Sequence, residues 1–307
     1  MTSQFNRTAI FISLGLSIVM VLAVLFGAKY VFNNVAKAPV AVSPVESKEA
    51  DSQACRSFID ALPDKVMDKP RADIADPVPS GVAAWAATSD DKVTVRCGVD
   101  MPFQYTEYSQ TQDVEGEQWF QVRDATPGSN LTTWYAAQRF PIVAVTASTD
   151  AEPGELNDAL SSLEEKPATA HDAPLKALKA GNDRMCAEVD KALPDSVAEG
   201  YNRRKVEEKN TYVWSADGRE DIVARCGVAK PENYRAGVKL QQVNDIPWFE
   251  DTTLAHGTTA GTWFALGRED YLALHAPQDA AQAALVEIGD VLAEHTTESR
   301  QRLGLLG

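Results

Sequence analysis

The sequence predicts an α+β fold: a tandem repeat of two modules, each a mostly antiparallel sheet with flanking helices, after an N-terminal transmembrane helix. Two observations predict this: an uncharged apolar stretch near the start, and a residue pattern that occurs twice. The copies are offset by 131 residues at their first cysteine and by 129 from their first tryptophan onward. The first copy contains Cys55, Ala61-Leu62-Pro63-Asp64, Trp85, Arg96-Cys97-Gly98-Val99, Pro102, Tyr105, Trp119-Phe120, Trp134 and Arg139, and the second contains Cys186, Ala192-Leu193-Pro194-Asp195, Trp214, Arg225-Cys226-Gly227-Val228, Pro231, Tyr234, Trp248-Phe249, Trp263 and Arg268. Because one register relates every tryptophan and every cysteine, the chain contains two copies of one module.

The apolar stretch covers residues 8–28 and contains no charged side chain. About 20 apolar residues at a rise of ~1.5 Å span the ~30 Å hydrocarbon core of a bilayer. We therefore predict a cytoplasmic tail (1–8), a transmembrane anchor (9–32) and a tether (33–51). A cleaved signal peptide is the alternative, because Ala36-Lys37-Ala38 loosely fits a cleavage site. The apolar stretch is longer than a signal peptide requires and ends well before that site, which favours the uncleaved anchor.

The four cysteines occupy matching positions, Cys55 and Cys97 in the first copy and Cys186 and Cys226 in the second. A paired set behind an export segment is typical of disulfides in an oxidising compartment. Four cysteines can form two disulfides in three ways. The duplication favours the connectivity in which each disulfide joins the two cysteines of one copy. The cysteines thus predict a single-pass protein of the cell membrane with both modules on the extracytoplasmic side. We expect no metal and no cofactor, because no Cys-x-x-Cys occurs and the four histidines do not recur in the first copy.

The element order predicted for each module is a helix, about five strands and a closing helix. We expect the first module over 52–165, a linker over 166–181, the second module over 182–296 and a tail over 297–307. The predicted elements of the first module are a cysteine helix ended by Pro63, a hairpin that turns at 89–91 and directs Cys97 inward, strands over 117–123, 131–138 and 141–147, and a closing helix with Leu156, Leu160 and Leu163. The second module repeats this order, with Asp183 as the expected cap of its cysteine helix and Leu285, Ile288 and Leu292 in its closing helix.

The recurring motif resembles a family, the actinobacterial domain of unknown function 3515. The resemblance is carried by a cysteine helix followed by Leu-Pro, a tryptophan strand, Arg-Cys-Gly-Val-x-x-Pro and a later tryptophan block, present in both copies. It implies an exported or membrane protein. Family members usually carry one copy, so the duplication is a departure from the family's pattern. The resemblance implies no activity, because none is assigned to the family.

Composition and motifs exclude several function classes. The net charge of −15 disfavours nucleic acid as a partner, because an acidic surface repels phosphate. No Gly-x-Ser-x-Gly, P-loop, Gly-x-Gly-x-x-Gly or His-Glu-x-x-His motif occurs. Asp64 and Asp195 recur, but each follows a helix-ending proline, which favours a turn role over general-base catalysis. The six tryptophans are expected in the cores, with a sugar-stacking platform as the alternative.

Candidate binding residues are the arginines and tyrosines of the recurring pattern and the loops beside them. Arg96 and Arg225 precede inward cysteines and so point to the opposite sheet face, as surface groups or as contacts to an anion. The loops after the two Gly-Val pairs differ between the copies, and binding usually resides in loops on a rigid sheet. The candidate binding set is therefore Arg96, Tyr105, Tyr108, Arg225 and Tyr234. We expect alanine at Tyr108 or Arg96 to weaken binding without changing the melting temperature.

The function these features favour is a membrane-anchored, extracytoplasmic tandem binding module of the cell envelope. The expected partners are the membrane, through the N-terminal helix, and an envelope protein or a cell-wall component. The alternative is an enzyme acting on cell-wall or lipid material, with one degenerate copy. That alternative predicts a polar cleft with strongly shifted carboxylate pKa values in one module only.

Overall fold

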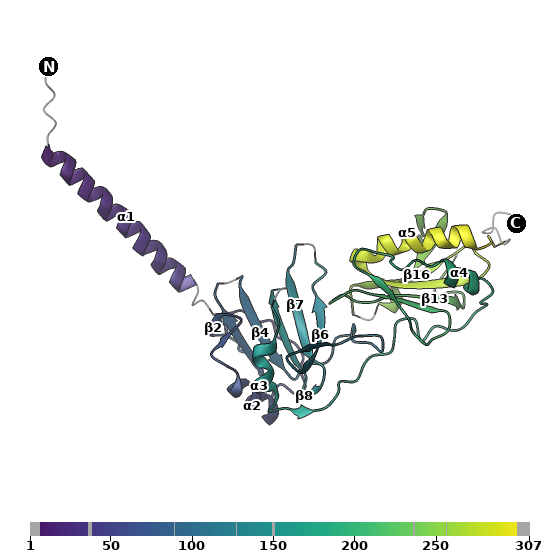
Figure 1. The fold of residues 1–307 in the computed structure, drawn as a ribbon, viewed down its shortest axis with the longest axis horizontal. Coiled ribbons are helices and arrows are strands. Elements are labelled where there is room, and N and C mark those ends of the chain that lie inside the picture. The colour runs from purple at the N-terminus through teal and green to yellow at the C-terminus, as the bar shows by residue number, and fades with distance from the viewer. Residues whose placement is uncertain are drawn as a thin grey trace, which may run out of the picture.

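The computed structural model describes residues 7–35, 39–88, 90–126, 128–148, 151–235, 237–255 and 257–299. Helix α1 (Arg7–Val35) projects away from the rest of the chain, which forms two sheet-containing modules (Figure 1). Its stretch Phe11–Tyr30 has a mean hydropathy of 2.5, is not buried against the protein, and is apolar enough to span a membrane. The predicted Ala36-Lys37-Ala38 site, the turn residue Ser89 and the tail from Arg300 onward lie outside the described residues.

The first module has one large antiparallel sheet. Helix α2 (Gln53–Ala61) precedes it, and short helical segments η1 (Gly154–Leu156) and α3 (Asn157–Leu160) follow it. Its strands are β1 (Lys65–Val66), β2 (Lys69–Ala72), β3 (Val82–Ala86), β4 (Lys92–Cys97), β5 (Gln112–Val114), β6 (Glu117–Arg123), β7 (Leu131–Ala136) and β9 (Val143–Ser148), in the order β1-β2-β3-β4-β9-β7-β6-β5. A separate pair joins β8 (Arg139–Phe140) to β10 (Glu164–Glu165).

The second module repeats this topology. Its strands are β11 (Asn202–Arg204), β12 (Thr211–Ser215), β13 (Ile222–Val228), β14 (Gln241–Val243), β15 (Ile246–Glu250), β16 (Ala260–Ala265) and β17 (Tyr271–Pro277), in the order β11-β12-β13-β17-β16-β15-β14. Helices α4 (Cys186–Ala192) and α5 (Gln278–His295) flank this antiparallel sheet, and η2 (Thr252–Leu254) lies in a loop. The predicted fold class is confirmed.

Three details of the sequence prediction are wrong. The sheets have eight and seven strands rather than about five, because the additional strands are too short to show an apolar alternation in the sequence. The closing helix of the first module is only the four residues of α3, whereas α5 has 18. Asp183 does not cap α4: the N-cap is Met185, and the Asp183 carboxylate accepts hydrogen bonds from Lys209 and Asn210. In the first module Ser52 is the cap, and its hydroxyl accepts the Cys55 amide at 3.2 Å.

All six tryptophans lie in the two cores, at most 2 % exposed, as the core interpretation predicted. Trp85 and Trp214 hold equivalent places, because the indole nitrogen of each donates to the carbonyl of a helix-ending proline, Pro63 or Pro194, at 3.0 Å. The recurrent Leu-Pro and the first tryptophan of each copy therefore form one unit that joins helix to sheet. No described tryptophan is exposed enough to offer a face for sugar stacking.

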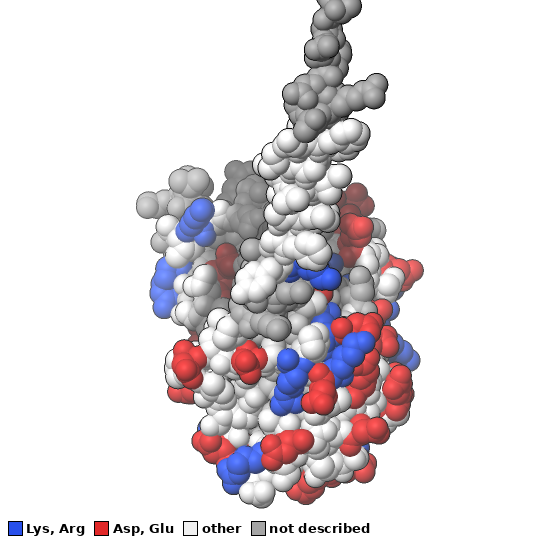
Figure 2. All heavy atoms as spheres, turned by 90° about the vertical axis from the view of Figure 1, so that its left-hand side faces the viewer, with Lys and Arg blue, Asp and Glu red and all other residues white. Residues whose placement is uncertain are grey.

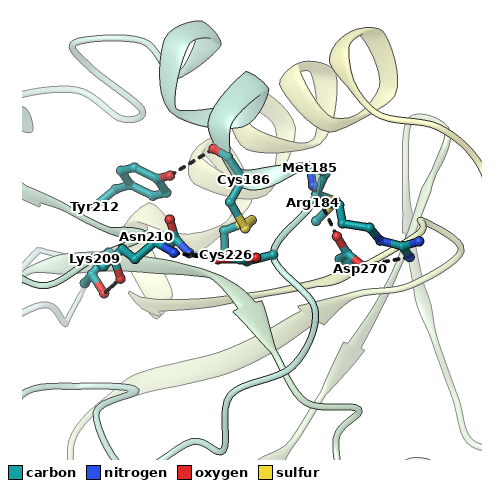
Figure 3. The surroundings of a disulfide bond; sticks show 10 residues. Arg184, Met185, Cys186, Lys209, Asn210, Tyr212, Cys226 and Asp270 are labelled. Carbon is teal, nitrogen blue, oxygen red and sulfur yellow. Dashed lines mark hydrogen bonds and ion pairs between the residues drawn. A yellow bond between two sulfur atoms is a disulfide. The ribbon is translucent and has the colours of Figure 1, made fainter.

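One disulfide in each module joins the cysteine helix to the sheet, Cys55–Cys97 in the first and Cys186–Cys226 in the second. This is the pairing within each copy that the duplication favours. Figure 3 shows the bond of the second module. The glycine after the second cysteine has a positive φ, +87° at Gly98 and +76° at Gly227. A Cβ on Gly98 would lie 2.5 Å from the Glu49 carbonyl carbon, so glycine is required where the incoming chain crosses the strand end.

The segments before the modules pack against them. Val40 is 5 % exposed and pairs as an isolated bridge with Ile74, next to the first sheet. In the linker, Ala173 and Leu175 are buried in a cluster with second-sheet residues such as Val213 and Phe264. The predicted tether and linker are therefore ordered where they meet the modules, and each contributes to a core.

A fragment limited to 182–299 is expected to be less stable than one spanning 166–299. The shorter fragment exposes the apolar surface that Leu175 covers and leaves Arg225 without its carbonyl acceptors. Together these should reduce the unfolding free energy by about 3 kcal/mol or more. Denaturant unfolding followed by tryptophan fluorescence measures it. Equal midpoints would show that the linker adds nothing to this core.

Candidate functional site

The two candidate arginines bind the backbone of the incoming chain. Arg96 Nη2 donates to the Ser43 carbonyl at 2.6 Å, and Arg225 Nη1 donates to the carbonyls of Leu175 and Leu178 at 2.8 and 3.0 Å. Both guanidinium groups do point away from the cysteine side of the strand. Their recurrence follows from one structural task, which is to fasten the segment that leads into each module.

The candidate tyrosines are also in structural contacts. Tyr105 packs on Phe120 and Tyr234 on Phe249, with ring centroids 5.0 and 5.5 Å apart, at equivalent positions of the two copies. Tyr108 is only 8 % exposed and belongs to the cluster that includes Leu175. Burial raises the pKa of Tyr108 to about 12. Because the Tyr108 side chain is part of a core, alanine at this position is now expected to lower the melting temperature rather than leave it nearly unchanged.

Further residues shared by the copies also serve the fold. The carbonyls of Asp64 and Asp195 accept the amides of Arg71 and Arg203, each at 2.7 Å, as expected of turn residues. Sequence comparison missed that Arg71 and Arg203 donate to carbonyls at the ends of α2 and α4. These two arginines are 132 residues apart, so they fall outside the common offset.

The junction between the modules brings together residues that the copies do not share. The Gly218 carbonyl, in the turn between β12 and β13, accepts the Arg123 amide of β6 at 2.7 Å. Arg204 of β11 donates to the Tyr108 carbonyl of the first module. Gly218 is buried, and a Cβ there would lie 2.6 Å from the Gln121 side-chain oxygen. The hairpin turn of the second module is thus seated on a strand of the first.

A polar cleft of about 270 Å³ lies at this junction. The first module lines it with amides and hydroxyls from the chain between Gln104 and Gln121, and the second lines it with β11 and the hairpin turn. Gln112 donates to Gln121 at 3.3 Å on the first-module side. The Nε atom of Arg204 is buried and has no hydrogen-bond partner among the described residues. The cleft therefore offers many hydrogen-bonding groups of both kinds.

Asp221 is a partly buried carboxylate of the cleft, with its side chain 13 % exposed. It accepts the Ser215 hydroxyl at 2.5 Å and lies 3.9 Å from Arg204. Burial raises the pKa of Asp221 to about 6, although Ser215 and Arg204 act in the opposite direction. At the common offset of 129 residues, Ala86 and Lys92 of the first module correspond to Ser215 and Asp221. This acid is therefore a feature of the second copy alone.

Asp221→Asn is expected to stabilise the protein more at pH 7.5 than at pH 5. The folded-state pKa of this acid is raised, so the stability linked to its protonation is full below its unfolded value and is lost as pH rises through about 6. The difference in unfolding free energy between variant and wild type should change by about 1.4 kcal/mol between these two pH values. Urea unfolding at both pH values measures it, with exposed Asp217→Asn as control. An equal difference at both values would contradict the assignment.

A second hollow, the junction cavity, has a volume of about 380 Å³. It is enclosed by Phe103 of the first module, linker residues 171–178, and Leu254 and His275 of the second module. Two of the four histidines, His171 and His275, line it. No pattern in the sequence predicts that these segments lie together.

His275 links a threonine to a glutamate inside this cavity. Its Nδ1 lies 3.3 Å from the Thr262 hydroxyl, and its Nε2 lies 3.1 Å from Glu220. Thr262 and His275 are cross-strand partners, and at the same offset the first module has the pair Thr133–Thr146, with hydroxyls 2.9 Å apart. Where the first module has a pair of threonines, the second has a threonine beside a histidine.

The described residues hold no cluster of three or more histidine, cysteine or acidic side chains that could bind a metal ion. The face of the first module next to α1 carries acidic and basic side chains intermixed (Figure 2). No patch of a single charge is visible on that face.

These features define a class: a tandem α+β protein with one disulfide in each module, behind one helix apolar enough to cross a membrane. The chain belongs to the family described as "Protein of unknown function (DUF3515)", whose model matches residues 14–169 and 158–301. The second match begins before the predicted module boundary and includes the ordered linker. No curated protein and no solved structure matches the chain.

Proposed function

We propose that this protein is a membrane-anchored, extracytoplasmic binding module of the cell envelope that acts by recognition rather than catalysis. Helix α1 supports the anchor, because its apolar side chains are exposed and charged groups are absent from residues 8–28. The two disulfides support an oxidising compartment for both modules. The partner is an envelope protein or a cell-wall component, and nucleic acid is disfavoured by the net charge of −15.

One observation supports the recognition function: the cysteines, tryptophans and arginines of the recurring pattern hold the fold, whereas the polar cleft at the junction also contains residues that the copies do not share. The shared cysteines, tryptophans and arginines bind their own module or its incoming segment. The polar cleft is instead lined by residues of both modules, including Gln121 and the second-copy residue Asp221. A duplicated module can acquire a binding site in this way, since only the core must be kept in both copies.

The test is co-sedimentation of the full chain, in nanodiscs, with isolated cell-wall and membrane-protein fractions. Gln112→Lys places a charge at the cleft and should reduce the sedimented fraction about tenfold or more. Gln282→Lys makes the same change on the exposed face of α5 and should leave the sedimented fraction unchanged. Equal loss in both variants, or no wild-type sedimentation with either fraction, would contradict the proposal.

A second candidate function is an enzyme acting on cell-wall or lipid material. It is favoured by Asp221, because a carboxyl with a strongly raised pKa in one module only is what that alternative requires. Such a carboxyl could serve as a general acid, and Arg204 and Ser215 would orient it. Release of soluble products from cell-wall or lipid substrates by wild type, and its loss in Asp221→Asn, would favour this candidate over recognition.

A further inference from the structure

The volume and the lining residues of the junction cavity are typical of a small-molecule binding site. Ligand pockets of about 300–1,000 Å³ are mostly apolar and contain a few converging polar groups, and this one measures about 380 Å³. Leu175, Leu178, Leu254 and Phe103 form its apolar part. Phe103 is 52 % exposed and its ring centroid lies 4.8 Å from that of His171, so an aromatic surface borders the opening.

The polar end of the junction cavity is acidic. The Glu220 side chain is 8 % exposed, and its only recorded ion-pair partner among the described residues is His275. Asp172 lines the cavity as well, but it is 85 % exposed and lies 3.6 Å from Lys176. Neither lysine nor arginine is among the described residues that line this cavity.

The hydrogen bonds of Glu220 leave it able to accept more donors. One oxygen, Oε1, meets His275 Nε2, while Thr262 occupies the other ring nitrogen. A carboxylate has about four acceptor positions and no proton to donate when ionised. A ligand head that carries N–H or O–H donors is therefore accepted, and a positive charge on that head is favoured where burial weakens solvent screening.

From this geometry we infer that the junction cavity binds a small molecule with an apolar body and an ammonium head. The body fills the space between Leu175, Leu178 and Leu254, and the head donates to the Glu220 carboxylate. The aromatic ring of Phe103 at the opening favours a cation as well. This inference rests on the proposed recognition function, since it names the ligand class of a second hollow at the same junction.

The test uses three probes with a phenyl body and different heads, added to the full chain in nanodiscs: 2-phenylethylammonium, 2-phenylethanol and 3-phenylpropanoate. Calorimetry or imidazole NMR shifts measure the dissociation constants. The ammonium probe should bind at least about tenfold more tightly than the alcohol, and the carboxylate should not bind. Equal affinity of the ammonium and carboxylate probes overturns the inference, as does absence of binding by all three.

Two variants locate the site. Glu220→Gln should lower the affinity for the ammonium probe about tenfold and leave the affinity for the alcohol unchanged. Glu287→Gln, on the exposed face of α5, should change neither affinity. Leu254→Trp fills the cavity and should abolish binding of both the ammonium and the alcohol probe, with Leu131→Trp at an exposed leucine as the matched control. Unchanged binding in Leu254→Trp overturns the inference. That failure leaves the proposed function intact if envelope co-sedimentation still depends on the polar cleft.

Discussion

Gly98→Ala is expected to lower the unfolding free energy of the first module by at least about 3 kcal/mol. The new methyl carbon would lie 2.5 Å from the Glu49 carbonyl carbon and 2.9 Å from the Ala50 Cα. Both are backbone atoms, so neither can move aside by changing a rotamer. Relief requires displacing residues 49–50, which would also disturb the start of the cysteine helix. Chemical denaturation followed by tryptophan fluorescence measures the loss.

Gly116→Ala is the matched control for this prediction. Its φ of +90° is close to the +87° of Gly98, but no atom lies within 4 Å of the added carbon. It should therefore cost only the left-handed backbone penalty of about 1–2 kcal/mol. The difference between the two variants isolates the close approach of the incoming chain. Equal losses would show that backbone conformation alone requires glycine at Gly98.

Removing the second disulfide by Cys186→Ala and Cys226→Ala is expected to destabilise the second module by about 4 kcal/mol. The bond joins residues 40 apart, so its loss restores the freedom of a long loop in the unfolded chain. Both sulfur atoms come from residues that are 2 % exposed, so the change also leaves a small void. The second module should then unfold at a lower denaturant concentration than the first.

The reciprocal pair, Cys55→Ala and Cys97→Ala, provides the comparison. Its loop of 42 residues predicts a similar loss, now in the first module. Peptide mapping without reductant should recover the Cys55–Cys97 and Cys186–Cys226 bonds in wild type. Recovery of a Cys55–Cys186 bond would contradict both the pairing and the independence of the two transitions.

The fold could be predicted from sequence where the two copies agree. A single register located the disulfides, the buried tryptophans and the central strands, because each of these depends on contacts repeated within a module. The edge strands β1 and β11 escaped because they have two and three residues and little apolar alternation. The mismatch between α3 and α5 escaped because leucine spacing alone does not show where a helix ends.

The candidate site could be predicted much less well. Arg96 and Arg225 were correctly placed on the opposite sheet face, but the carbonyls they bind come from distant residues such as Ser43 and Leu178. Tyr108 was expected on an accessible loop, but it is buried in a cluster with the linker and the second sheet. A signal for the junction was nevertheless present. At the common offset, Lys92 and Thr146 correspond to Asp221 and His275, two unlike replacements, one just before β13 and one on the neighbouring strand β17.

The packed segment between α1 and α2 determines how the first module responds to mechanical tension applied at its N-terminus. A pull along α1 first loads the Val40–Ile74 bridge and the Arg96–Ser43 hydrogen bond, which lie ahead of the cysteine helix. If these yield, the load reaches Cys55 and passes through the disulfide directly to β4. The chain between Cys55 and Cys97 then cannot extend under the applied force, so about 140 Å of extended chain length does not contribute to stretching. The disulfide thus limits how far the first module can be stretched.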